Sequence, residues 1–214
     1  MAGGVKPRTS VYIDAFNLYF GALKGTPHRW LDVLAMCQAY LPGNDIISIK
    51  YFTAKVSARP NDLQQPVRQQ AYLRALATIP CVEIIYGHYL SHVVRARLAT
   101  PPAHGPATVE IIKTEEKGSD VNLATHLIHD AHLNRFDIAV VVSNDSDLLA
   151  PIKLVRQDLG KQVGILNPQK HPSRALLPHT DFLKQIRGAA LAASQFPAQL
   201  VDADGHVIHI PAGW

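Results

Sequence analysis

Short apolar runs alternate along this chain with longer segments in which apolar residues recur at helical spacing. Five of the runs are rich in β-branched residues and bounded by polar or turn residues, a pattern typical of buried strands. They cover residues 11–13, 46–52, 82–86, 138–142 and 163–166. Residues 121–131 and 148–159 carry apolar side chains three and four positions apart, which predicts amphipathic helices. Because βαβ units form parallel sheets, we expect an α/β fold with a mostly parallel central sheet and helices on both faces.

Two stretches interrupt this alternation. Residues 91–98 and 108–113 are strand-like and flank a Pro-rich segment, which predicts a projecting β-hairpin inserted over about residues 90–113. Near the C-terminus, strand-like residues on both sides of Asp204 and Gly205 predict a second, small hairpin. We therefore expect one domain over residues 8–187, followed by a C-terminal extension over residues 188–214.

Composition and charge narrow the class of protein. The chain has 214 residues, of which 47% are hydrophobic and 18% are charged, so it has enough apolar residues to build a core. No apolar run approaches the roughly 18 residues of a membrane-spanning helix, so we expect no integral membrane protein and no membrane partner. The 21 Lys and Arg residues against 17 Asp and Glu residues give a net charge of +4, which permits a polyanionic partner without requiring one.

The N-terminal segment and the cysteines bear on the compartment. Residues 1–8 lack the apolar stretch of a signal peptide, so we expect a cytoplasmic protein. Cys37 and Cys81 lie inside apolar segments and follow no metal-ligand spacing. A disulfide scaffold and a zinc finger are therefore not expected.

Carboxylates directly follow two of the predicted strands. Asp14 comes after the first strand, and Asp145 and Asp147 come after the fourth. Asp120 opens a helical segment, and its spacing from the apolar residues four and seven positions later predicts that it points to the buried side of that helix. Because the carboxyl ends of parallel strands lie along one edge of a sheet, we expect these side chains to converge there.

Helix capping explains any one of these residues, since Asp is a favoured N-cap that contributes about 1 kcal/mol, and Asp147 in particular precedes a helical segment. Capping does not explain the whole set, because clustered carboxylates repel one another. A hard divalent cation such as Mg²⁺ or Mn²⁺ resolves the conflict and supports phosphodiester hydrolysis. An aspartyl phosphatase is disfavoured because Asp14 has no second Asp two residues later, and dinucleotide binding is disfavoured because no glycine-rich turn follows the first strand.

Three motifs contain these acids: residues 12–18 (YIDAFNL), 116–124 (EKGSDVNLA) and 142–148 (VSNDSDL). Together they resemble the NYN family, specifically its bacterial LabA-like branch, within the PIN-like nuclease superfamily. The resemblance implies a three-layer α/β/α sandwich and a Mg²⁺- or Mn²⁺-dependent ribonuclease acting on RNA, which we expect to be single-stranded. It further implies that Asp14, Asp120 and Asp145 bind the metal, with Asp147 beside them.

The resemblance also assigns roles to two polar residues. Asn17 would orient the first acid or a metal-bound water, and Ser143 would support the site through hydroxyl hydrogen bonds. Many PIN domains carry a further acid on an early helix, whereas residues 63–78 contain no Asp or Glu here. This departure leaves open the number of metal ions, and it leaves a non-catalytic RNA-binding or regulatory protein as the alternative. A DNA nuclease is a further alternative, because the preference for RNA rests on the resemblance alone.

Side chains on one predicted helix supply candidate RNA contacts. Gln70 and Arg74 lie four positions apart and hence on one helical face, shortly after Arg68. We expect this surface to contact phosphates beside the acids, with an ordinary solvated face as the alternative.

The hairpin and its base carry further basic residues. Arg95 and Arg97 would follow an RNA backbone, unless they are the alternating charges of an ordinary exposed hairpin. Lys117 lies three positions before Asp120 and would either neutralise phosphate or pair with a carboxylate. The C-terminal extension is a candidate surface for a homodimer or a protein partner.

Histidines and aromatic residues complete the candidates. His126, His129 and His132 recur every three residues, but that period drifts around a helix and no HExxH pattern is present. We therefore expect solvent-facing histidines and no zinc site. Most aromatic residues near the first acid are expected in the core, with Phe16 or Tyr19 available to stack on a base.

Overall fold

A six-stranded parallel sheet, in the order β3-β2-β1-β6-β7-β8, forms the centre of the protein. Its strands are β1 (Arg8–Asp14), β2 (Asp45–Thr53), β3 (Val82–Tyr86), β6 (Ile138–Val142), β7 (Gln162–Asn167) and β8 (Phe182–Gln185). The structure, a computed structural model, describes residues 5–214, so the first half of the segment that bears on a signal peptide, residues 1–4, lies outside the described residues. The sheet confirms the predicted α/β class.

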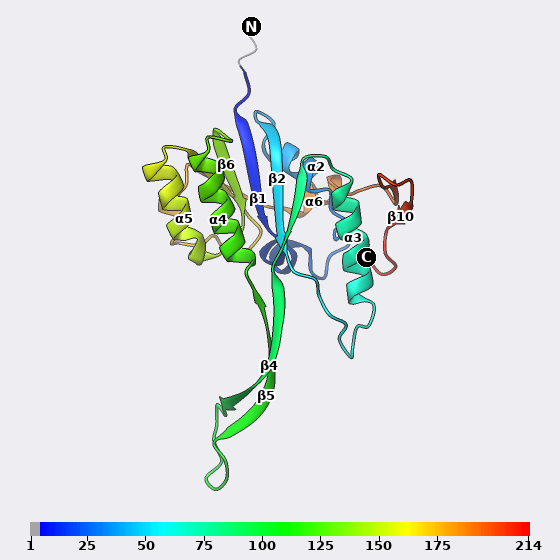
Figure 1. Cartoon of the computed structure of the whole chain (residues 1–214), viewed down its shortest axis with the longest axis vertical. Helices are drawn as coiled ribbons and strands as arrows, with labels where there is room; N and C mark the ends of the chain where they lie inside the picture. Colours follow the sequence, from blue (N-terminus) through cyan, green and yellow to red (C-terminus); the bar gives the residue numbers. More distant parts are fainter. Residues whose placement is uncertain (1–4) are drawn as a thin grey trace.

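Helices cover both faces of this sheet, giving three layers. They are α1 (Ala15–Leu18), η1 (Tyr19–Leu23), α2 (Val33–Tyr40), α3 (Gln65–Ala77), α4 (Ser119–His132), η2 (Ser146–Leu148), α5 (Leu149–Lys153), η3 (Leu154–Asp158), η4 (Leu177–His179) and α6 (Gly188–Ala193). Helices α4 and α5 lie on one side, and α2, α3 and α6 lie on the other (Figure 1). Among residues 5–214, none of the helices combines the length and the apolar composition that crossing a bilayer would take.

Alternate residues of the central strands supply two hydrophobic cores. Val11 and Ile13 of β1 pack in one core with residues of α2 and α3, whereas Tyr12 packs in the other with Leu123 of α4. Because both faces of β1 are buried, the strand is a continuous apolar run, as parallel strands usually are. β1 pairs with β2 on one side and β6 on the other, so its last residue, Asp14, lies centrally on the edge formed by the strand ends.

Two elements differ from the sequence-based expectation. The pattern does not predict β8, because this edge strand has only four residues and two of them are Lys184 and Gln185. The single helix expected over residues 148–159 is divided into η2, α5 and the π-helical η3, with Pro151 in the first turn of α5. Proline lacks a backbone N–H and is tolerated in a first turn, so α5 begins just before it.

The buried face of α4 is rotated relative to the prediction. Leu123, Leu127 and Ala131 are buried, whereas Val121 is 68% exposed. These buried residues lie four positions apart and therefore form one row along the helix. That row, and not the row containing Val121, faces the core between α4 and the sheet.

The histidines of α4 form no metal-ligand group within the described residues. His129 and His132 are exposed, as expected. The expectation is wrong for His126, which is half-buried: its ring centroid lies 5.7 Å from that of Phe52, and its Nδ1 lies 3.1 Å from Lys50 Nζ. Burial and the neighbouring Lys50 charge lower the pKa of His126.

The predicted hairpin is present and projects far from the sheet (Figure 1). It consists of β4 (His88–Arg97) and β5 (Thr108–Lys117), paired antiparallel with His88 opposite Lys117. Both strands extend closer to the sheet than the sequence pattern indicates. The pattern places the start of the first strand at residue 91 and the end of the second at residue 113, whereas the strands start at His88 and end at Lys117. As a result, Glu116 and Lys117 lie at the base of the hairpin, next to the start of α4.

The C-terminal segment folds back onto the domain. It contains α6 and the predicted small hairpin, formed by β9 (Gln199–Val201) and β10 (Val207–His209). The rings of Phe196 and Trp214 pack against Trp30 with centroid distances of 5.8 and 6.1 Å. The C-terminal extension therefore shares the core on the α2 and α3 side of the sheet.

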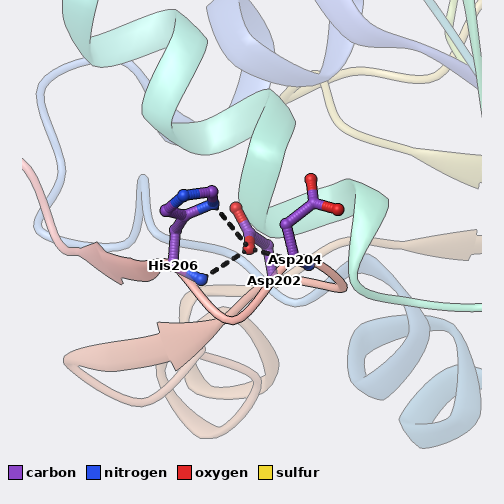
Figure 2. A group of neighbouring side chains, drawn as sticks. All are labelled: Asp202, Asp204 and His206. Carbon is purple, nitrogen blue, oxygen red and sulfur yellow. Dashed lines mark hydrogen bonds and ion pairs between the residues drawn. The ribbon is translucent and has the colours of Figure 1, made fainter.

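Asp202 fastens the turn of this small hairpin, as Figure 2 shows. Its Oδ1 accepts hydrogen bonds from the backbone N–H groups of Asp204 and His206 at 3.2 and 2.8 Å. Its Oδ2 accepts one from Arg74 of α3 at 2.6 Å. The Arg74 guanidinium, together with the His206 N–H, lowers the pKa of Asp202. These contacts explain why Asp202, Asp204 and His206 lie close together, since they form a turn that is anchored to α3.

Candidate functional site

Asp14 ends β1 and is almost completely buried, with 5% of its surface exposed. One carboxylate oxygen accepts a hydrogen bond from the backbone N–H of Asn17 at 2.9 Å, which caps α1. The other accepts one from the Ser143 hydroxyl at 2.9 Å. Burial raises the pKa of Asp14 despite these two hydrogen bonds, which act to lower it. A buried carboxyl group with a raised pKa is typical of functional sites.

Ser143 links Asp14 to the loop that follows β6. Its hydroxyl oxygen accepts a hydrogen bond from the backbone N–H of Asp145 at 3.1 Å. Asp145 in turn caps η2 by accepting a hydrogen bond from the N–H of Asp147 at 3.0 Å. The N-cap of η2 is therefore Asp145. Asp147, which the sequence suggests as a cap, instead lies exposed inside the first turn of η2.

The base of the hairpin contributes a further carboxylate, Glu116, which is not among the predicted site residues. Glu116, near the end of β5, accepts hydrogen bonds from the backbone N–H and the hydroxyl of Ser119 at 3.1 and 2.7 Å. Gly118, with a φ of +97°, makes the turn between β5 and α4. This turn brings Asp120 into the first turn of α4, close to Glu116.

These segments surround one hollow of about 240 Å³, which we call the acidic hollow. It is lined by Asp14, Phe16, Asn17, Phe20, Glu116, Ser119, Asp120, Asp145 and Gln169. Four of the lining residues are acids, and none is Lys or Arg. The structure thus brings together three of the four predicted acids and adds Glu116, while Asp147 is not among the lining residues.

Asp120 lies at the mouth of the acidic hollow. It is exposed, which corrects the expectation that it points to the buried side of α4; the buried row of that helix passes through other positions. Partial withdrawal of its carboxylate from water, followed by the negative charges of Asp14 and Asp145, raises the pKa of Asp120 to about 6. Withdrawal from water is the larger cause of this pKa shift, and the neighbouring negative charges of Asp14 and Asp145 add to it.

The donor set fits a hard divalent cation. All four charged groups offer carboxylate oxygens, the ligands that Mg²⁺ and Mn²⁺ prefer. Among residues 5–214, three potential ligand atoms come within 4.8 Å of one another only at Asp202, Asp204 and His206, so the carboxylates of the acidic hollow are spaced more widely. With this spacing at most two of these carboxylates could ligate one ion directly, and waters of the ion would contact the others.

The side chain of Asn17 holds the opposite loop rather than Asp14 itself. Its Oδ1 accepts hydrogen bonds from the backbone N–H of Asn144 at 3.2 Å and from the Gln169 amide at 3.5 Å. Only the backbone N–H of Asn17 contacts Asp14. Asn17 therefore fixes the position of the loop that carries Asp145.

Of the three residues predicted on α3, Gln70 and Arg74 lie away from the acids, whereas Arg68 lines a cavity next to the acidic hollow. Gln70 and Arg74 line a separate hollow of about 350 Å³, and Arg74 is paired with Asp202. Arg68 is paired with Asp62 and lines another cavity. The expectation of a surface beside the acids is therefore wrong for Gln70 and Arg74, because Gln70 lines a hollow shared with β3 and Arg74 reaches the C-terminal hairpin.

The basic residues of the hairpin are exposed. Arg95 pairs with Glu110 at 3.4 Å, and Arg97 lies near the hairpin tip. Lys117 lies 3.3 Å from Glu115 and does not line the acidic hollow. Lys117 was expected either to neutralise phosphate or to pair with a carboxylate, and in the structure it pairs with the carboxylate of Glu115.

Comparison with known proteins places the chain in a family. Residues 8–184 match the NYN domain. The chain belongs to the NYN domain family. The match includes β1, the hairpin base and the loop after β6, and hence all four acids of the acidic hollow.

Two individual proteins are similar to this NYN chain. The 6-hydroxy-3-succinoylpyridine 3-monooxygenase HspA of Pseudomonas putida is 32% identical, over 89% of this chain and 70% of the relative. The crystal structure of a protein of unknown function from Vibrio parahaemolyticus superposes with a TM-score of 0.55 at 16% identity, covering 88% of this chain and 98% of that one. The second similarity supports the fold alone.

Proposed function

We propose that this NYN protein is a Mg²⁺- or Mn²⁺-dependent ribonuclease that hydrolyses RNA phosphodiester bonds. One observation carries the proposal: four carboxylates from three separate segments of an NYN domain line a single hollow that contains no basic residue. Placement in the LabA-like branch, and single-stranded RNA as the substrate, are part of the same proposal.

The proposed roles follow from the geometry. Asp14, Glu116, Asp120 and Asp145 would hold the cation, and Asp147 would act from outside the hollow. When bound, the cation would supply a nucleophilic water and stabilise the charge that develops on the leaving oxygen. Ser143 positions Asp14 through its hydroxyl group, and Asn17 positions the loop of Asp145. Arg95, Arg97 and Lys117 offer positive charge along the hairpin for the RNA backbone.

The decisive experiment is cleavage of single-stranded RNA by the purified chain, with Mg²⁺ or Mn²⁺ and with EDTA. Asp14→Asn and Asp145→Asn should abolish cleavage while the melting temperature shows an intact fold. Asp158→Asn, an exposed aspartate of η3 outside the hollow, is the matched control and should cleave normally. Unchanged cleavage in both site variants would reject the proposal. RNA binding that weakens with salt, without metal-dependent turnover, would instead favour the non-catalytic alternative.

A second candidate function comes from the relative of Pseudomonas putida, whose name describes a monooxygenase of a substituted pyridine. The observation that favours a small aromatic substrate is a cavity lined by aromatic side chains that shares Phe16 and Phe20 with the acidic hollow. Monooxygenation would insert one atom of O₂ into the substrate and reduce the other to water, with two electrons from an added reductant. Substrate-dependent oxygen uptake with NADH, in a preparation that leaves RNA intact, would favour this candidate.

A further inference from the structure

A second cavity, of about 340 Å³, adjoins the acidic hollow. Its walls come from α1, η1, the end of β2, the loop before α3, α3 itself, the start of β4 and the C-terminal Trp214. We call it the aromatic cavity. It shares Phe16 and Phe20 with the acidic hollow, so these two side chains lie between the two cavities. Its volume lies at the small end of the range for ligand pockets, about 300–1,000 Å³, and suits a ligand built on one ring system.

Aromatic side chains dominate its lining. They are Phe16, Tyr19, Phe20, Tyr51, Tyr72, Tyr89 and Trp214. Tyr51 and Tyr72 are each 5% exposed, whereas Phe20 is 55% exposed, so the cavity runs from a buried inner end to an open outer end. Phe16 and Tyr89 pack edge to face with centroids 6.0 Å apart, which fixes two of the rings. Fixed, planar side chains are the surfaces on which flat ligands stack.

The charge of the aromatic cavity is opposite to that of the acidic hollow. Lys24, Arg29, Arg59 and Arg68 line it, and Asp62 is the one carboxylate in its lining. Asp62 is already paired with Arg68. Within residues 5–214, the other three cations form no ion pair. The cavity therefore presents unneutralised positive charge to whatever occupies it.

Arg29 gives the most specific indication of an anion. Its Nε is buried and has no hydrogen-bond partner among the described residues. The guanidinium lies 5.8 Å from the ring centroid of Trp214, and its terminal nitrogen donates to the carbonyl of Gly213. The cation–π contact accounts for the guanidinium face but leaves the Nε–H unsatisfied. Arg29 also lines the cavity and forms no ion pair among the described residues, so its guanidinium charge is available to an anionic group there.

We propose that the aromatic cavity binds a planar heteroaromatic ring that carries an anionic group. The ring stacks among Phe16, Tyr19 and Tyr89, and the anionic oxygens accept hydrogen bonds from Arg29 and Arg59. Two sources share this chemistry: a nucleotide, with its base and phosphate, and a small pyridine-type carboxylate. The inference goes beyond hydrolysis, because it requires neither a metal ion nor the acids of the neighbouring hollow.

The test measures binding to the full chain in EDTA, by calorimetry and by tryptophan fluorescence, since Trp214 lines the cavity. Adenosine 5′-monophosphate is compared with adenosine, and nicotinate is compared with nicotinamide, so that each pair differs in the anionic group. We expect at least one anionic probe to bind about tenfold more tightly than its neutral counterpart. The pair that shows the difference identifies the source. Equal affinities within both pairs, or no binding of any probe at millimolar concentration, would overturn the inference.

Variants locate the site. Arg59→Gln should weaken the anionic probe about tenfold and leave the neutral probe unchanged, and Phe20→Ala should weaken both. Both residues are exposed, so the fold should survive, as the melting temperature checks. Arg187→Gln, at an exposed arginine that lines neither cavity, is the control and should change nothing; an equal effect at Arg187 would contradict the location.

Asp14→Asn separates this inference from the proposed ribonuclease activity. The variant should bind the anionic probe with unchanged affinity while it loses RNA cleavage. Loss of probe binding in Asp14→Asn would overturn the inference about the aromatic cavity. A wild-type chain that binds the probe but cleaves no RNA would overturn only the proposed ribonuclease.

Discussion

Glu116 holds the start of α4 through Ser119, whose backbone N–H and hydroxyl both donate to its carboxylate, at 3.1 and 2.7 Å. This contact joins the base of the projecting hairpin to the helix that carries Asp120. It also turns a carboxylate of β5 toward the acidic hollow, where Glu116 lies among the lining residues. One side chain thus serves as a structural clamp and as a candidate ligand.

We expect Glu116→Gln to lower both Mn²⁺ affinity and RNA cleavage about 10- to 100-fold. Gln keeps the shape and still accepts a hydrogen bond from Ser119, but it has no negative charge to offer a cation. Glu115→Gln is the matched control, because Glu115 pairs with Lys113 and Lys117 outside the hollow. The affinity is followed as the rise in melting temperature during a Mn²⁺ titration. An equal loss in both variants would remove Glu116 from the site.

The raised pKa of Asp120 predicts how stability depends on pH when no divalent cation is present. Its folded-state pKa is about 6, above the ordinary value of 3.8, so the folded state holds this proton more tightly than the unfolded state. The resulting stabilisation is complete below pH 3.8 and is lost as the pH rises through about 6. In EDTA, the melting temperature of Asp120→Asn minus that of the wild type should therefore increase between pH 4 and about pH 7. A constant difference across this range would contradict the shift.

A divalent cation should reverse this dependence, because it binds the ionised carboxylates. Mn²⁺ at about 100 times its Kd should stabilise the wild type by about 2.7 kcal/mol at about pH 7.5. The gain should shrink toward about pH 5, where protons compete for Asp14 and Asp120, whose pKa values are both raised. Thermal melts at both pH values measure the effect. The same gain in Asp14→Asn as in the wild type would exclude Asp14 as a ligand.

Gly87 lies where a side chain would displace Glu116. A Cβ at this position would contact a carboxylate oxygen of Glu116 and would come within 2.6 Å of the Lys117 carbonyl oxygen. We expect Gly87→Ala to destabilise the protein by about 1–3 kcal/mol and to lower Mn²⁺ affinity, because both the strand and Glu116 must shift. Gly43→Ala is the control, since nothing lies within 4 Å of its Cβ position. Urea unfolding of both variants, with Mn²⁺ titrations, checks this; full Mn²⁺ affinity in Gly87→Ala would disprove the link.

A buried ion pair between Lys50 of β2 and Asp130 of α4 should contribute strongly to the free energy of unfolding. Lys50 Nζ lies 2.7 Å from Asp130, which also accepts hydrogen bonds from Tyr12 and Arg135, each at 2.8 Å. Burial acts to raise the pKa of Asp130, but these partners outweigh it and leave the pKa lowered. Lys50→Met should cost about 3 kcal/mol in urea unfolding at neutral pH, because it leaves a buried carboxylate short of one partner. Lys6→Met, at an exposed lysine, should stay within about 0.5 kcal/mol of the wild type.

The sequence was sufficient for the features that depend on local pattern. The five apolar runs became parallel strands, and Asp14 and Asp145 followed from their positions directly after strand ends. Glu116 escaped notice because its place depends on the length of the hairpin, which the alternating polar residues of β5 do not reveal. Asp120 lines the hollow as expected, but its side chain is exposed, because the buried row of α4 runs through Leu123, Leu127 and Ala131 instead.

Contacts between segments distant in sequence also could not be predicted from the local pattern of hydrophobic and polar residues. The helical spacing made Arg74 a candidate phosphate contact. In the folded chain it pairs instead with Asp202 of the C-terminal hairpin, which is 128 residues away in sequence. The aromatic cavity has the same origin, since Phe16, Arg59 and Trp214 meet only in the folded chain. Nothing in the local spacing of these residues predicts that they line the same cavity.

The position of β1 between β2 and β6 imposes an order in time on the assembly of the site. Asp14 leaves the ribosome early, but Ser143, which donates to its carboxylate, is synthesised 129 residues later. A nascent chain that ends with α4 has β1 and β2 but lacks the strand that brings Asp145 to the same edge. In the function we propose, the catalytic centre therefore cannot form until β6 and the loop that follows it have left the ribosome.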